Sequence, residues 1–150
     1  MYNVLTGAQM FSVRTLCQTP ESMDAALKAL SEMGYTSVQL SSHNQEIDPA
    51  AIKDMMDKYS LKCNSTHIGF NEMEENIEGV IARHNLWNCA YPGVGGMPGE
   101  FRGSAEGIRE FARRANIVGK KLRDAGMTFI YHNHAFEFER YGVKNGIIKG

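Results

Sequence analysis

The sequence predicts an α/β fold of the parallel (β/α) barrel type, with about five strand–helix steps in one domain over residues 1–150. Three observations predict it. Short apolar or alternating runs alternate with longer runs of helical period. A helix end, a glycine and a strand start occur twice, at residues 32–38 and 124–130, as a βαβ array requires. Polar residues gather where the strands end, which is the active-site face of a parallel barrel.

The first three strands and two helices follow from apolar spacing and from helix start and stop signals. Thr or Asp directly before Pro supplies an N-cap and a proline at the first helical position. Glycine after an apolar stripe predicts the end of a helix. In chain order these signals predict a strand at 8–13, a helix from Thr19-Pro20 to Gly34, a strand at 36–41, a helix from Asp48-Pro49 and a strand at 61–67.

The alternation continues in the second part of the chain. An apolar stripe predicts a third helix over roughly residues 72–86, and a short strand near 88–91 opens into a glycine-rich loop at 92–99. Ser104 then caps a long helix that precedes the fifth strand, at residues 127–132. The backbone amides of the glycine-rich loop could contact a phosphate. An ordinary loop is the alternative, because the pattern is not a Walker motif.

Strict alternation leaves two architectures, a doubly wound open sheet or part of an eight-stranded barrel, which needs ~250 residues. The first strand-to-helix connection, residues 13–17, lacks the G-x-G-x-x-G turn of a dinucleotide fold. The 150 residues are therefore expected to form a partial, truncated barrel that does not close by itself. Open strand edges favour association, so we expect a homo-oligomer, a dimer, that completes it.

Composition excludes several classes of protein. The net charge of −1 lacks the basic excess of a nucleic-acid binder. The cysteines Cys17, Cys63 and Cys89 form no C-x-x-C pair, which favours reduced thiols over a disulfide framework or a structural zinc site. No signal peptide and no apolar run of ~18 residues is present, so we expect a cytoplasmic protein with no membrane partner.

The residues that carry the most chemistry follow the third and fifth predicted strands. His132 and His134 alternate within residues 131–139 and would point to the same side if the strand continues. Two imidazoles near a carboxylate at a strand end suit a divalent metal or acid–base catalysis. A polar surface loop is the alternative. His67 ends the third strand and is a second candidate, His43 lies in a polar loop, and His84 is expected to be structural.

The sequence resembles the sugar phosphate isomerase/epimerase family, the xylose isomerase-like barrels. Four segments carry the resemblance, and they occur in the expected order over nearly the whole chain: residues 7–14 (GAQMFSVR), 65–70 (STHIGF), 91–98 (YPGVGGMP) and 131–134 (YHNH) with Glu137-Phe138. The combination is more specific than any one segment.

The resemblance implies a (β/α)8 barrel and proton transfer next to the carbonyl of a sugar or sugar phosphate. It also implies a divalent metal, Mn²⁺ first, with Mg²⁺, Co²⁺ or Zn²⁺ as alternatives, that polarises the carbonyl. Carried over by residue, it places Glu137 and His132 at the metal, Glu137 and His134 in catalysis, and three residues at the substrate: Gln9, His67 and Asn133.

Two departures from the family pattern matter. Many members carry glutamate where this chain has His132, and Glu139 could take the place of Glu137. The family also draws ligands from strands six to eight, so the ligand shell is expected to be partial. Two alternatives stay open: a non-catalytic barrel that binds a sugar or a partner, and a metal-dependent nuclease resembling AP endonucleases, which the near-neutral charge disfavours.

Overall fold

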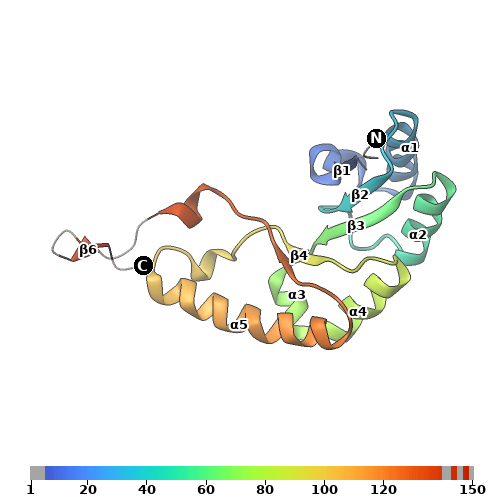
Figure 1. The fold of residues 1–150 in the computed structure, drawn as a ribbon. Helices are drawn as coiled ribbons and strands as arrows, with labels where there is room; N and C mark the ends of the chain where they lie inside the picture. Colours follow the sequence, from blue (N-terminus) through green and yellow to red (C-terminus); the bar gives the residue numbers. More distant parts are fainter. Residues whose placement is uncertain (1–5, 140–142, 145–146, 149–150) are drawn as a thin grey trace, which may run out of the picture.

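Five strands pair side by side in one parallel sheet, in the order in which they occur along the chain (Figure 1). The structure is a computed structural model, and it describes residues 6–139, 143–144 and 147–148. The strands of this sheet are β1 (Gly7–Gln9), β2 (Ser37–Leu40), β3 (Lys62–His67), β4 (Pro92–Val94) and β5 (Ile130–Tyr131).

Helices and short helical turns connect consecutive strands. The α-helices are α1 (Pro20–Glu32), α2 (Pro49–Lys58), α3 (Phe70–Glu75), α4 (Ile77–Leu86) and α5 (Ala105–Asp124). Short 3-10 helices form η1 (Met10–Leu16), η2 (Gly99–Phe101) and η3 (Ala135–Phe138), and β6 (Val143–Lys144) pairs antiparallel with β7 (Ile147–Ile148). No helix in the described part of the chain is long and apolar enough to cross a membrane.

The strand order decides between the two architectures that the sequence left open. A doubly wound sheet reverses its strand order at a switch point, whereas a barrel adds each new strand beside the previous one. The observed order is sequential, and Figure 1 shows α1, α2, α4 and α5 along one side of the sheet. The prediction of a parallel barrel type with five steps is therefore confirmed.

The helix start and stop signals are also confirmed. Thr19 caps α1 by accepting a hydrogen bond from the Ser22 backbone, and Asp48 caps α2 in the same manner through Ala50. Gly34 follows α1 with a φ of +90°, a conformation that suits glycine because it has no Cβ. Local capping chemistry thus sets the bounds of these helices.

Apolar side chains on one face of the sheet form the core against the helices. In β2, Val38 and Leu40 are fully buried, while Ser37 and Gln39, which alternate with them, are partly exposed. One cluster joins β1, β2 and β3 to α1 and α2, and a second joins β4 to α3, α4 and α5. The opposite face, which we call the open face, carries the alternate residues of the strands.

Four predicted elements were wrong in their bounds. The fifth strand, predicted at 127–132, is observed only at Ile130–Tyr131. The strand predicted at 8–13 ends at Gln9, because the chain turns into η1 and buries Met10. The single helix predicted over 72–86 is two helices, since Asn76 leaves the helical conformation (φ −137°, ψ 50°) and caps α4 through the Gly79 backbone.

The fourth strand was predicted too early in the chain. Residues 88–91 are not a strand, because Asn88 takes a φ of +52°. The strand is instead Pro92–Val94, at the start of the segment predicted to be a glycine-rich loop. A Cβ at Gly93 would lie 2.5 Å from a side-chain carbon of Ile130, so glycine is needed for the close approach of β4 and β5.

Candidate functional site

A ladder of amide and hydroxyl side chains crosses the open face from β1 to β3. The Gln9 amide donates to Gln39 Oε1 (3.1 Å), and the Gln39 amide donates to Ser65 Oγ (3.0 Å). Ser65 Oγ in turn donates to Asn64 Oδ1 (2.9 Å), and the Asn64 amide donates to Ser37 Oγ (3.1 Å). The predicted substrate residue Gln9 is thus held by neighbours rather than isolated.

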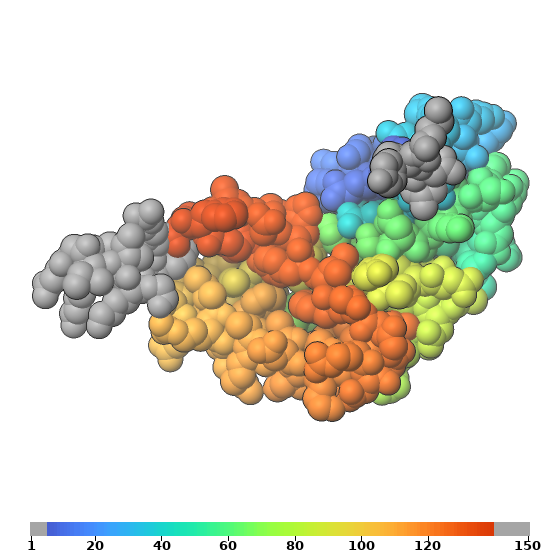
Figure 2. All heavy atoms as spheres, viewed as in Figure 1, coloured from blue at the N-terminus to red at the C-terminus, as the bar shows by residue number. Residues whose placement is uncertain are grey.

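Three imidazoles converge beyond this ladder, where β3 and β5 end. The ring of His67 lies 5.1 Å from the ring of His132, centroid to centroid, and the ring of His132 lies 4.9 Å from that of His134. His132 and His134 are exposed and His67 is half-buried. Figure 2 shows that the segment after β5, in red, and the N-terminal part, in blue, both lie along the same side of the molecule.

Glycines of the loop after β4 leave room for this convergence. A Cβ added at Gly95 would lie 3.3 Å from Nδ1 of His67, and one added at Gly96 would lie 2.9 Å from Cε1 of His134. Gly96 also has a φ of +152°, a conformation that residues with a side chain rarely adopt. These glycines therefore leave space for the histidine cluster, a role that neither of the two interpretations of this loop from the sequence, phosphate contact or an ordinary loop, included.

Tyr131 fixes the segment that carries His134. Its hydroxyl donates to the Glu137 carboxylate and accepts a hydrogen bond from the Met97 backbone N–H (3.1 Å). The other carboxylate oxygen of Glu137 accepts from the backbone N–H of His134 (2.7 Å). Tyr131, which the sequence analysis did not single out, thus joins the loop after β4 to η3.

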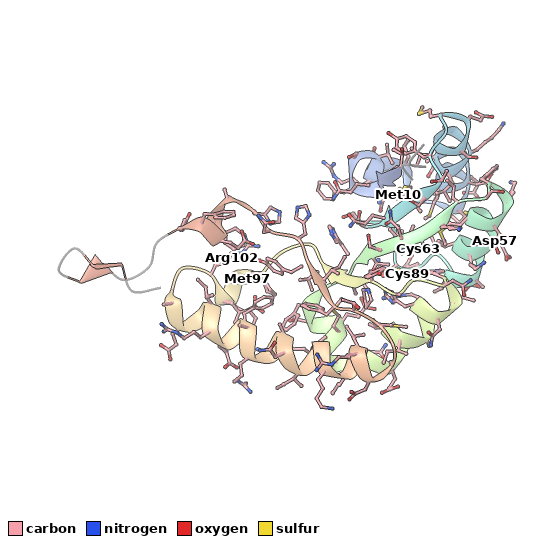
Figure 3. All side chains as sticks on the ribbon, viewed as in Figure 1. Met10, Asp57, Cys63, Cys89, Met97 and Arg102 are labelled. Carbon is pink, nitrogen blue, oxygen red and sulfur yellow. The ribbon has the colours of Figure 1, made fainter. Side chains whose placement is uncertain are left out.

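Arg102 holds the same loop from the other side. Its guanidinium donates to the backbone oxygen of Met97 (2.8 Å from Nε) and lies over the Phe136 ring, 4.1 Å from the centroid. Figure 3 shows Arg102 and Met97 beside each other below the segment that follows β5. The two contacts connect the loop after β4 to η3 a second time.

A small pocket extends from His67 toward the end of β2. Its volume is about 260 Å³, and His43 and His67 both line it. The ion pair of Arg83 with Glu72 (2.7 Å) lies on its wall, and His43 stands edge-on to Trp87 at 6.2 Å. The structure therefore brings His43 next to the candidate site.

His84 is structural, as predicted. It is fully buried between Thr66, whose hydroxyl lies 2.8 Å from Nε2, and the backbone oxygen of Val80, 2.7 Å from Nδ1. Both ring nitrogens are therefore engaged within the core.

Burial sets the charge state of the imidazoles that are least exposed. Desolvation, followed by the positive charge that His132 and His134 can carry, lowers the pKa of His67 below 6.5. Desolvation is also the largest cause of the lowered pKa values of His43 and His84. These three rings are neutral at pH 7 and can accept a proton or a hydrogen bond.

The pair of Tyr131 and Glu137 is shifted in opposite directions. Burial and then the contact with Glu137 raise the pKa of Tyr131 to about 12, so it stays a hydrogen-bond donor. Desolvation by itself raises the pKa of Glu137, but the hydrogen bonds from Tyr131 and from the His134 backbone outweigh it and lower the pKa. Glu137 is thus an ionised carboxylate whose two oxygens are already engaged.

The predicted metal ligands His132 and Glu137 lie in different surroundings. Within residues 6–139 no three side chains of His, Cys, Asp or Glu are grouped so that they could hold a metal ion. His132 lies among imidazoles, whereas Glu137 faces Tyr131. The described residues therefore do not form a metal centre by themselves. Asn133, the remaining predicted residue, is exposed between the two histidines.

Comparison with known proteins gives the fold a context. The sequence matches no protein-family model and no curated protein. It is similar in structure to a sugar phosphate isomerase/epimerase from Parabacteroides distasonis, with a TM-score of 0.72 and 21% identity over 100% of this chain and 58% of that chain. At this identity the likeness shows a shared fold, and the chain spans 58% of the length of that protein.

Two further solved structures are similar over most of the chain. D-allulose 3-epimerase from Methylomonas sp. has a TM-score of 0.62 and 14% identity, covering 83% of this chain and 49% of that chain. An AP endonuclease of family 2 from Brucella melitensis has a TM-score of 0.65 and 13% identity, covering 85% of this chain and 55% of that chain. The fold is therefore shared by proteins of different activity.

Proposed function

We propose that this chain carries the first five strand–helix steps of an isomerase or epimerase that acts on sugars or sugar phosphates. The observation that supports it most is the convergence of His67, His132 and His134 where β3 and β5 end. In parallel barrels the reacting atoms lie at this end of the strands. Two of the structural neighbours are named as an isomerase/epimerase of sugar phosphates and an epimerase of D-allulose.

In both isomerisation and epimerisation, a proton is removed from a carbon next to a carbonyl, and a proton is then returned to the substrate. In our proposal the imidazole of His134 exchanges this proton, because it is exposed and its backbone is fixed by Glu137. The neutral ring of His67 binds a hydroxyl or carbonyl oxygen of the substrate. Gln9 and Asn133 are proposed to bind further hydroxyl groups, with Gln9 oriented by Gln39.

A divalent ion, with Mn²⁺ as the first choice, stays part of the proposal. A metal would polarise the carbonyl and stabilise the enediolate. His132 and Glu137 are the proposed ligands, but they do not form a three-ligand group with any other described residue. The proton transfer is therefore assigned to the protein's own side chains.

The dimer is also proposed rather than observed. In the described sheet β1 and β5 are the edge strands, and each has one side without a strand partner. Unpaired backbone groups along such edges favour association with another strand. Native mass spectrometry with Mn²⁺ in the buffer would report the number of chains and of bound ions together. A monomer without metal at all protein concentrations would contradict both proposals.

Hydrogen exchange into the substrate tests the proposed reaction. The full chain is incubated in D₂O with Mn²⁺ and with a panel of ketoses and ketose phosphates, and deuterium next to the carbonyl is followed by NMR. We expect incorporation with at least one sugar, and a loss of ~100-fold in the variant His134→Ala. Binding of a sugar without exchange would instead support a non-catalytic barrel, and cleavage of abasic-site DNA would support the nuclease.

A further inference from the structure

A cavity lies beside the three imidazoles and shares the loop after β4 with them. Its volume is about 400 Å³, and the loop glycines Gly95 and Gly96 form part of its wall. The same glycines border the histidines, because a Cβ at Gly95 would lie 3.3 Å from Nδ1 of His67 and one at Gly96 would lie 2.9 Å from Cε1 of His134. The cavity and the histidine cluster are therefore adjacent, so one elongated ligand can occupy both.

Arg102 gives this cavity its charge. Among the described residues that line the cavity, Arg102 is the one charged side chain, and no carboxylate is present. Arg83 and Arg114, by contrast, are each paired with a glutamate. Arg102 instead donates to the backbone oxygen of Met97 and lies over the Phe136 ring (Figure 3). Its positive charge is thus not neutralised by an ion pair with any described carboxylate.

Several hydrogen-bond donors of the residues that line this cavity are not engaged within the protein. In Arg102, Nε and Nη2 donate to Met97, while Nη1 makes no hydrogen bond to a described residue. The backbone N–H groups of Gly95 and Gly96 and the side-chain amide of Asn71, which also lines the cavity, likewise have no acceptor among the described residues. A cavity that offers N–H donors and a positive charge but no carboxylate suits an anion with several oxygens.

Arg102 and His134, the residue proposed to exchange the proton, border the same point of the loop. A Cβ at Gly96 would lie 3.8 Å from Nη2 of Arg102 and 2.9 Å from Cε1 of His134. Both side chains also contact Phe136. The guanidinium carbon of Arg102 lies 4.1 Å from the centre of the Phe136 ring, and the His134 ring stacks on it with centroids 5.8 Å apart. An anionic group at Arg102 and a reacting carbon at His134 can therefore belong to one small molecule.

We propose that this cavity binds the phosphate group of a phosphorylated ketose whose carbonyl end lies at His134. The inference rests on the proposed function, and it narrows the substrate class from sugars in general to sugar phosphates. Arg102 donates to two phosphate oxygens through Nη1 and Nη2, and the N–H groups of Gly95 and Gly96 donate to the remaining oxygens. Because Met97 and Phe136 already hold the Arg102 side chain, little conformational freedom is lost on binding. A ketose without phosphate leaves these donors without an acceptor, so it binds more weakly.

Binding of inorganic phosphate tests the site without any need for turnover. In ¹H–¹⁵N NMR spectra of the wild-type chain, we expect phosphate to shift the amide signals of Gly95 and Gly96 and the Nε–H signal of Arg102, whereas chloride at equal ionic strength leaves them in place. The variant Arg102→Gln stays polar but loses the charge, so its affinity for phosphate should be roughly 10-fold lower or less. Arg109→Gln is the matched control and should bind phosphate as the wild type does, because Arg109 is exposed on α5 and does not line the cavity.

The exchange reaction gives the second test. Deuterium exchange is measured with a ketopentose and with its 5-phosphate, and we expect kcat/KM to be roughly 10-fold higher or more for the phosphate. This preference should be lost in Arg102→Gln and kept in Arg109→Gln.

Two results would overturn the proposal: no shift of the Gly95 and Gly96 signals by phosphate, or equal kcat/KM for the two sugars. Phosphate binding at Arg102 without exchange of any sugar would contradict the proposed function and leave the phosphate site standing, so the two failures are distinguishable. The decisive measurements use the wild-type chain, so they hold even if Arg102→Gln folds poorly.

Discussion

The rings of His67 and His132 lie 5.1 Å apart although β4 separates the strands that carry them. Strands two places apart in a sheet are separated by roughly 9.6 Å, so the two imidazoles must reach toward each other above β4. They can do so because the loop after β4 begins with a glycine, which has no side chain to fill the space between the two rings. A side chain at Gly95 would begin 3.3 Å from Nδ1 of His67, in the space that the ring needs.

We predict that Gly95→Val separates these two imidazoles. Valine adds two methyl groups beyond the tight Cβ position, so the His67 ring must move away from His132. Hydrogen exchange into a sugar should fall ~10-fold or more, since small displacements in an active site are costly. Gly99→Val is the matched control, because a Cβ there contacts nothing within 4 Å. Equal activity of both variants would show that Gly95 has no such role.

We predict that Tyr131→Phe destabilises the protein by about 1–2 kcal/mol. The change removes the hydroxyl that joins the Met97 backbone to Glu137, and it leaves the half-buried Glu137 carboxylate with one fewer donor. Urea unfolding followed by circular dichroism measures the loss. Tyr91→Phe serves as the control, since Tyr91 is 49% exposed, and its stability should stay within about 0.5 kcal/mol of wild type. A comparable loss in both variants would refute the link.

We predict that stability decreases as the pH falls from 7 to 5. The pKa values of His43, His67 and His84 are lowered in the folded state, mainly by burial. Below pH 6.5 the unfolded chain therefore binds protons that the folded chain does not bind, and each such histidine removes up to about 1.4 kcal/mol per pH unit.

Urea titrations at pH 7, 6 and 5 measure this dependence. The variant His84→Gln cannot take up the proton, so its curve should be less steep although its stability at pH 7 is lower. A free energy of unfolding that is constant from pH 7 to 5 would mean that these histidines titrate normally in the folded protein.

Much of the fold could be predicted because its signals are local. Thr19-Pro20, Asp48-Pro49 and Ser104 each begin a helix through a cap that depends on a few adjacent residues. The break at Asn76 was missed because the apolar stripe continues on both sides of it, and the capping of Gly79 by Asn76 is visible only in the structure. Strand β4 was misplaced because Pro92 and Gly93 are typical of turns.

The candidate site could be predicted in part. Histidines at the ends of two predicted strands were expected to share one face, and His67, His132 and His134 do meet. The role of Gly95 could not be read from the sequence, because it depends on the packing of three strands. The engagement of Glu137 by Tyr131 likewise depends on the turn η3, which has no periodic pattern.

The convergence of the three imidazoles is the claim on which the proposed function depends, and NMR of the histidine rings tests it directly. In the variant His132→Asn we predict that the ring signals of His67 and His134 shift, because they lose an imidazole 5.1 and 4.9 Å away. The signals of His84, buried beside Thr66, should stay in place. Unchanged signals of His67 and His134 would contradict the account.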